Sequence, residues 1–251
     1  MNEDFYDRKI ARNYENKRKA DRYWDWEEST LLELVARLKE VEHKRILDCP
    51  VGTGRFIEKL APKCSQYTGV DISKHMLEVA EEKLCDKIGN VNFLQCDVTS
   101  LDIDVDLIIC FRLLHLVDTE NAIKLISKLS HLTNGYIILQ AFDVHDYRIS
   151  LPRFRNLIAS SKSVIRFGYM YRSIRSLVSG KIFRKGGCVS VSDRHGDYSE
   201  ETYWLNMRTI LSTFKKNNMK IVSEIRLTDN HHYEKENHFV STKIILVQSD
   251  A

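Results

Sequence analysis

The fold is decided by one stretch of sequence, Arg45-Ile46-Leu47-Asp48-Cys49-Pro50-Val51-Gly52-Thr53-Gly54-Arg55-Phe56. Its first apolar residues predict a short buried strand that ends in an acid, Asp48. Gly52 and Gly54 predict a tight turn whose backbone can pass close to a ligand, because glycine has no Cβ. A strand, a glycine-bearing turn and a helix start, in this order, place a small-molecule site at the carboxyl edge of a sheet.

Two kinds of nucleotide ligand use such a turn, and the residues discriminate between them. A dinucleotide site has the pattern G-x-G-x-x-G, and here Ile57 stands where the third glycine would be. Asp48 would repel a pyrophosphate but attract an ammonium group. S-adenosylmethionine carries an ammonium group, a sulfonium and no phosphate, so the turn fits that ligand better.

The pattern Asp48-x-Pro50-x-Gly52-x-Gly54 resembles the first motif of class I S-adenosylmethionine-dependent methyltransferases, which that family writes D/E-x-G-x-G-x-G. The departure is Pro50, which stands at the family's first glycine and requires a negative φ there. The resemblance implies an α/β fold with a Rossmann-like seven-stranded sheet whose last strand is antiparallel. It also implies S-adenosyl-L-methionine as the cofactor.

Acids at the ends of the next two predicted strands extend the resemblance. Asp71 ends the second strand, where an acid some 20 residues beyond the turn can bind ribose hydroxyls. Capping of helix 74–84 is the alternative. The family's acid after the third strand accepts the adenine amino group beside the next backbone amide, and Asp97 and Val98 match them. The implied cofactor site is completed by Asp48, Pro50, Gly52, Gly54, Ile72, Met76 and Phe111. Packing in a helix core explains Met76 equally well.

Candidate catalytic residues are histidines near the carboxyl edge of the predicted sheet. The segment after the fourth strand borders sulfonium and acceptor in the family, which makes Arg112 a candidate substrate-binding residue. His115 in the same segment is a candidate base, or a histidine hydrogen-bonded within the fold. His145 and His195 are further candidates. A base is needed only for a hydroxyl acceptor, which must lose a proton.

Residues 1–41 predict an N-terminal helical cap, because aromatic residues recur there among many charges. In small-molecule methyltransferases such a segment closes over the cofactor, and by this resemblance Tyr14 lines the acceptor pocket. Packing of the aromatic face on the flank of the sheet is the alternative for Tyr23, Trp24 and Trp26.

Residues 147–197 predict a basic helical insertion, or lid, after the fifth strand. Ten of the chain's 38 Lys and Arg residues lie between 147 and 192, and none of its 35 Asp and Glu residues does. This charge indicates an anionic partner, with Arg172 and Arg175 as candidate substrate-binding residues. A solvated basic face without a partner is the alternative.

The methyltransferase core is predicted over 42–146 and 198–251. A helix is expected from Ser199 to about Asn217, because Ser199 is followed by two acids. Strands 220–227 and 242–247 then close the sheet. No metal site is predicted, because His231 and His232 lack matching ligand spacing.

Composition limits where the protein can be located but does not indicate a function. The six cysteines have no C-x-x-C spacing and indicate buried apolar positions in a reducing compartment. No apolar run is long enough to span a bilayer, and residues 1–4 lack a secretory signal. We therefore expect a cytoplasmic protein.

Three functions follow from these residues. The first is methyl transfer to an O or N atom of a small molecule or glycan, with an anionic acceptor as one form. The second is methylation of RNA, with the basic insertion as the phosphate footprint. It is not favoured, because no RNA-binding module and no N-P-P-[YF] signature are present. The third is a non-catalytic cofactor-binding protein that docks on a membrane surface or a partner.

Overall fold

The structure is a computed structural model that describes residues 11–14, 22–84, 89–143, 187–192, 199–204, 207–226 and 241–250. Residues 11–14 are helical. The longer helices are α2 (Arg22–Ala36), α3 (Ile57–Leu60), α4 (Lys74–Leu84), α5 (Thr119–His131) and α9 (Met207–Lys216). Short 3-10 turns are η2 (Val41–His43), η3 (Ala61–Lys63), η4 (Val98–Ser100) and η5 (Leu114–Leu116). The strands are β1 (Arg45–Asp48), β2 (Gln66–Asp71), β3 (Val91–Gln95), β4 (Val105–Cys110), β5 (Thr133–Asp143), β6 (Gly187–Ser192), β7 (Ser199–Trp204), β8 (Met219–Arg226) and β9 (Ser241–Ser249).

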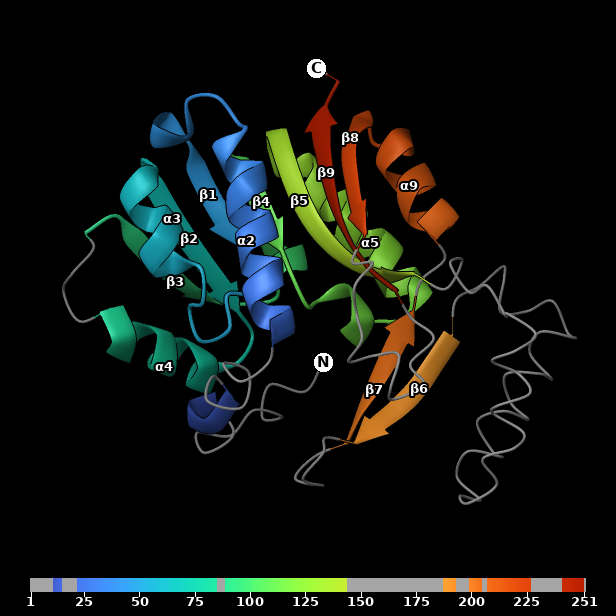
Figure 1. Ribbon diagram of the computed structural model, residues 1–251, viewed down its shortest axis with the longest axis horizontal. Coiled ribbons are helices and arrows are strands. Elements are labelled where there is room, and N and C mark those ends of the chain that lie inside the picture. The colour runs from blue at the N-terminus through green and yellow to red at the C-terminus, as the bar shows by residue number, and fades with distance from the viewer. Residues whose placement is uncertain are drawn as a thin grey trace, which may run out of the picture.

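Seven of these strands form one sheet in the order β3-β2-β1-β4-β5-β9-β8 (Figure 1). The first five are mutually parallel, and β9 pairs antiparallel with both β5 and β8. The expected seven-stranded α/β sheet with an antiparallel last strand is therefore confirmed.

Helices cover both faces of this sheet, as the nearly continuous apolar runs of the parallel strands require. On one face, α2 contributes Leu31 and Leu34 to a core with Ile46 and Ile138. On the other face, α5 and α9 pack on β4, β5 and β9. The helices contribute Leu125, Ile126, Ile210 and Phe214, and the strands contribute Ile108, Ile137 and Ile245. In Figure 1 α2 lies in front of the sheet near β4, parts of α5 are visible behind β9 and β8, and α9 lies beside β8.

The order of the strands determines where a ligand can bind. The chain runs outward from β1 through β2 to β3 and then returns to β4 on the other side of β1. The carboxyl ends of β1 and β4 therefore form the topological switch point, which is the ligand-binding position of open α/β sheets. The glycine turn follows β1, and the segment with Arg112 follows β4.

The helix expected from Ser199 is wrong in its first half. Residues 199–204 form strand β7, which pairs antiparallel with β6 in a separate two-stranded sheet, and α9 begins only at Met207. Ser199 and the two acids after it resemble a helix start. The following Thr202, Tyr203 and Trp204 are strand-forming residues, and pairing with β6 overrides the helix signal.

The helical insertion predicted over 147–197 contains β6, so residues 187–192 are a strand and not a helix. Residues 144–186 lie outside the described residues, and the helices expected there stay a prediction. In Figure 1 β6 and β7 lie below the carboxyl edge of the large sheet, and β7 contacts β5 and η5.

Asn134-Gly135 is a pair typical of a helix C-terminal end, but here both residues lie inside β5. Helix α5 already ends at His131. The pairing of β4 with β5 shifts register between Val105 and Leu107, and there a Cβ on Gly135 would lie 2.0 Å from the carbonyl oxygen of Asp106. Glycine at 135 permits this close approach of two strands.

Among the described residues, no helix is long and apolar enough to cross a membrane.

Candidate functional site

The glycine turn is anchored to the strands on both sides of β1. The N–H of Cys49 donates to the carbonyl of Ile109 at 3.0 Å, and the N–H of Val51 donates to the carbonyl of Val70 at 2.9 Å. The peptide between Cys49 and Pro50 is cis.

Both turn glycines adopt the left-handed backbone region, with φ of +54° at Gly52 and +74° at Gly54. A Cβ on Gly54 would lie 2.9 Å from Ile57 Cδ1 and 3.1 Å from Ala80 Cβ, so packing against the neighbouring helices excludes a larger residue. A Cβ on Gly52 would meet no atom within 4 Å. Gly52 therefore faces open space at the switch point, and it is the backbone there that a ligand can approach.

Asp71 ties this turn to the start of α4. Its Oδ2 accepts a hydrogen bond from the N–H of Gly52 and its Oδ1 accepts one from the N–H of Ser73, both at 2.9 Å. Burial raises the pKa of the Asp71 carboxyl, and the backbone hydrogen bonds oppose that rise. The Ser73 hydroxyl accepts a longer hydrogen bond from the N–H of Met76, at 3.4 Å. Ser73 thus caps α4 and Asp71 holds the turn against the start of that helix, while the binding of ribose by Asp71 stays a prediction.

Asp48 lies beneath the turn with an exposed fraction of 1%. Its Oδ2 accepts a hydrogen bond from the hydroxyl of Tyr67 at 2.6 Å, and Tyr67 is itself fully buried in β2. Burial raises the pKa of Asp48 to about 7; the Tyr67 hydrogen bond and Arg55 lower it, and Asp71 raises it further. Tyr67 was not predicted as a site residue, since on sequence it is one apolar position of a strand.

The predicted adenine residues lie at the carboxyl ends of β2 and β3. Asp97 is exposed, and its Oδ1 accepts from the N–H and the hydroxyl of Thr99, both at 2.8 Å, which caps η4. Val98 is buried and Ile72 is half-buried. Met76 packs in a small apolar cluster with Ala11 and Val79, and Tyr14 packs against the same cluster. The structure thus brings Tyr14 and Met76 together, two residues that the sequence predicted for different parts of the site.

The segment after β4 forms the other side of the switch point. Phe111 is buried and meets Phe56 edge to face, with ring centroids 5.4 Å apart. Arg112 has φ of +59°, a left-handed conformation that is uncommon outside glycine. His115 is half-buried in η5, the turn that β7 contacts. The other predicted residues, His145, His195, Arg172 and Arg175, lie outside the described residues.

A buried charge network joins the two sides of the switch point, and it was not predicted. Its centre is Glu27 of α2, whose side chain is fully buried. Glu27 Oε2 accepts from Arg55 Nη1 at 2.8 Å and from Arg112 Nε at 3.1 Å, and Oε1 accepts from Arg112 Nη2 at 3.0 Å. The Nε2 amide of Gln140 in β5 also donates to Glu27.

Trp24 of α2 completes this network. Its ring lies beneath the guanidinium carbon of Arg55, 4.3 Å from the ring centroid, and its carbonyl accepts from Arg55 Nη2. Burial lowers the pKa of Arg55 to about 10, while Glu27 acts to raise it. Among the described residues Arg55 Nε is buried without a hydrogen-bond partner, although Glu28 Oε2 lies 3.6 Å away. A sequence signal for this network existed in Arg55, a cation directly after the turn, but its acidic partner lies 28 residues away.

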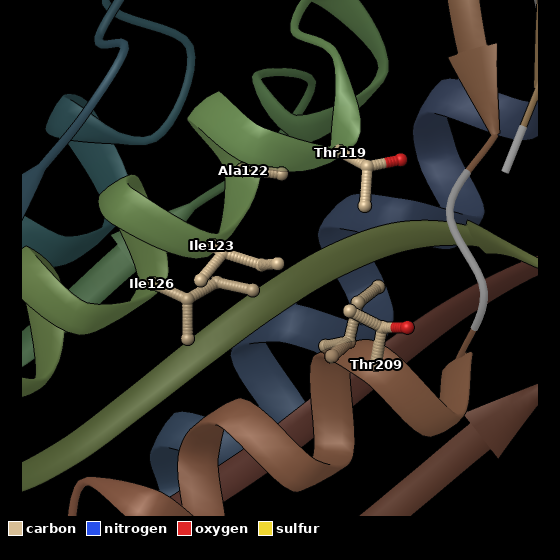
Figure 2. Close-up of a pocket in the computed structure, with 6 residues that line it drawn as sticks. Thr119, Ala122, Ile123, Ile126 and Thr209 are labelled. Atoms are coloured by element: carbon tan, nitrogen blue, oxygen red, sulfur yellow. The ribbon is translucent and has the colours of Figure 1, made fainter. Parts of the chain in front are cut away.

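A separate depression of about 170 Å³ lies between α5 and α9. Figure 2 shows Ala122, Ile123 and Ile126 of α5 facing α9, with Thr119 and Thr209 at the rim. Its lining has no acid, base or charged group, so we assign it no role in the site.

The chain is similar to known proteins both in sequence and in fold. A sequence family described as a methyltransferase domain matches residues 46–134. A Geobacillus protein (strain WCH70), provisionally named as a methyltransferase, is 33% identical over 106 residues, which are 41% of this chain and 42% of that protein. The chain thus matches less than half the length of this curated relative.

Solved structures extend the likeness to nearly the whole chain. An S-adenosylmethionine-dependent methyltransferase from Clostridium acetobutylicum has a TM-score of 0.61 at 18% identity, covering 97% of this chain and 98% of that one. The magnesium protoporphyrin IX methyltransferase of Synechocystis with bound SAM has a TM-score of 0.58 at 16% identity, covering 91% and 80%. At such identities the likeness shows the fold alone.

The strand order, the glycine turn at the switch point and the matched domain agree with one another. Residues 46–134 match the methyltransferase-domain family, and the chain has the fold of S-adenosylmethionine-dependent methyltransferases of known structure.

Proposed function

We propose that this protein is an S-adenosylmethionine-dependent methyltransferase that methylates an O or N atom of a small molecule or glycan. The observation that supports this most is the position of Gly52. It lies at the switch point in a left-handed conformation, with open space where its Cβ would be and with its N–H held by Asp71.

The residues present fit this cofactor. The backbone at Gly52 can lie against the cofactor's amino-acid portion, and Asp71, with two hydrogen bonds already made, has further lone pairs for ribose hydroxyls. We assign the adenine to Asp97, Val98, Ile72 and Met76. Asp48 is buried beneath the turn and bonded to Tyr67, so we place it behind the cofactor's ammonium group rather than in direct contact.

When bound, the cofactor supplies a methyl group on a positively charged sulfur, and the protein's part is to hold the acceptor in line with it. Such positioning supplies much of the rate of a transfer reaction. His115 lies beside the switch point on η5 and is our candidate to take a proton from a hydroxyl acceptor. Tyr14, packed near Met76, is our candidate contact for the acceptor.

We propose further that the acceptor is an anionic small molecule, and that the compartment is the cytoplasm. The Synechocystis relative acts on magnesium protoporphyrin IX, a small molecule, which supports that class of acceptor. The acid-free basic segment 147–192 supports the negative charge, with Arg172 and Arg175 as its contacts. Transfer to RNA at comparable efficiency would favour the alternative function.

The test has two parts. Calorimetric titration should show binding of S-adenosylhomocysteine and no binding of NAD. Gly52→Ala should weaken that binding at least tenfold, because its Cβ projects into the cofactor's space, while Gly89→Ala, at another open position, should leave it unchanged. Incubation with methyl-labelled cofactor and pools of anionic metabolites, glycans and RNA then identifies the acceptor class. Binding of NAD in place of S-adenosylhomocysteine would refute the proposal, and cofactor binding without turnover on any pool would favour a non-catalytic role.

A further inference from the structure

The network around Glu27 is unusual for a helix that only covers a sheet. Elsewhere along its length α2 buries apolar side chains: Leu31, Leu34 and Val35. Burying a carboxylate with arginines is often no more stabilising than a well-packed apolar side chain at the same place. Stability alone therefore does not explain why an acid stands at position 27.

The partners of Glu27 lie on the elements that form the switch point. Arg55 directly follows Gly54 on the β1 side, and Arg112 follows β4. Gln140 adds a second bond to the same segment, because its Oε1 accepts from the N–H of Arg112 at 2.9 Å. One carboxylate and one amide thus hold both the side chain and the left-handed backbone of Arg112.

Arginine forks fix direction as well as distance, since their N–H groups are coplanar and rigid. Glu27 receives such a fork from Arg112, through Nε and Nη2, and one further N–H from Nη1 of Arg55 on the other side of the switch point. Glu27 therefore ties the residue that follows the glycine turn to the residue that follows Phe111 at the end of β4.

We propose that Glu27 is a positioning residue for the cofactor site. It sets the separation of the two sides of the switch point, and it thereby couples the docking of α2 to cofactor binding. This inference rests on the proposed function. Because such coupling is reciprocal, a ligand that needs this spacing stabilises α2 in its docked position, and loss of the spacing weakens binding of the ligand.

The experiment compares two adjacent acids of α2. Glu27→Gln keeps the shape of the side chain but removes the charge that both guanidiniums share. Glu28→Gln is the matched control, because Glu28 is more exposed, lies near Arg55 only at 3.6 Å and pairs with Lys59. We expect Glu27→Gln to raise the Kd for S-adenosylhomocysteine at least tenfold and Glu28→Gln to change it less than twofold, both in protein shown to be folded by circular dichroism.

Hydrogen exchange on the unmodified protein gives a readout that does not depend on the variant folding. Saturating S-adenosylhomocysteine should slow exchange of the amides around Glu27 in α2 as well as those of residues 51–56. Slowing in the turn but not in α2 would overturn the proposal, as would an unchanged Kd in Glu27→Gln. If the unmodified protein bound no S-adenosylhomocysteine at all, it is the proposed function that would fail.

Discussion

At the scale of single residues, the two buried acids at the turn differ in their partners. Asp71 accepts from backbone N–H groups, whereas Asp48 accepts from one hydroxyl in a fully enclosed place. Each therefore controls a different property. Asp71 holds the shape of the turn and is our proposed contact for ribose, and the raised pKa of buried Asp48 makes the stability of the fold depend on pH.

Folding raises the pKa of Asp48 from 3.8 to about 7. Between these two pH values the carboxyl is protonated in the folded state but ionised in the unfolded state. This stabilisation is complete below pH 4 and is lost as the pH rises through about 7. At about 1.4 kcal/mol for each unit, the loss is on the order of 4 kcal/mol. Asp48→Asn keeps an acceptor for Tyr67 but does not titrate.

We therefore expect the melting temperature of the wild type, measured relative to Asp48→Asn, to fall between pH 4 and pH 8. Scanning calorimetry at pH 4, 5, 6, 7 and 8 checks this. A constant difference across that range would show that Asp48 is ionised when folded.

Asp71→Asn should weaken binding of S-adenosylhomocysteine about 10- to 150-fold. The substitution removes a charge-assisted hydrogen bond worth about 1.5–3 kcal/mol. It also places an amide N–H2 against a backbone donor, either Gly52 or Ser73. Calorimetry is the measurement, with the exposed Asp102→Asn as the control, which should bind as the wild type does. Equal affinity of both variants would remove Asp71 from the cofactor site.

At the scale of elements, the strands of the seven-stranded sheet were predictable because their signal is local. An apolar run followed by an acid marks β1, and β2 and β5 repeat that form with Asp71 and Asp143. The register of β4 with β5 is not local. It depends on Gly135 lying against the Asp106 carbonyl, and in the sequence Asn134-Gly135 is equally typical of a helix end.

Gly135→Ala should destabilise the protein by about 1–3 kcal/mol, the usual cost of overpacking. The added Cβ meets a backbone oxygen and not a flexible side-chain end, so β4 and β5 must separate. Gly89→Ala is the control, because its Cβ enters open space and should leave stability unchanged or slightly higher. Urea unfolding of the two variants measures the difference. Similar urea midpoints for the two variants would show that β4 and β5 can separate with no loss in the free energy of unfolding.

At the scale of the whole molecule, contacts between distant residues limited what the sequence could show. In the Glu27 network the hydrogen-bonded residues Glu27 and Gln140 are 113 positions apart in the sequence. The hydrogen bond from Tyr67 to Asp48 joins two neighbouring strands, β2 and β1. Neither set of contacts leaves a periodic pattern of residues in the sequence from which it could be predicted. The turn and Asp48 were found because one short motif contains them, and Asp71 because it ends the next strand. The network exists only once α2 lies across β1, β4 and β5.

Charge is also distributed unevenly over the molecule, since the segment 147–192 is basic and free of acids. If it contacts the acceptor, replacing both Arg172 and Arg175 with alanine should raise the acceptor's KM about tenfold or more and leave the cofactor Kd unchanged. Added salt should raise the wild-type KM more than the variant's, because screening acts on charges that the variant lacks. Steady-state kinetics between 0.05 and 0.5 M salt, about a threefold range of Debye length, is the measurement. Unchanged KM and salt dependence would redirect the search to neutral acceptors.

The interior place of β9 has a consequence for the order of assembly. In the sheet β9 lies between β5 and β8, although it is later in the sequence than both. As the polypeptide emerges from the ribosome, the five parallel strands can pair as they appear, but β8 has no neighbour until residues 241–249 have been made. During that interval β5 exposes an open edge of eight residue positions that β9 later occupies. Such an edge can recruit another strand, so the nascent protein is most exposed to aggregation just before synthesis of this strand is complete.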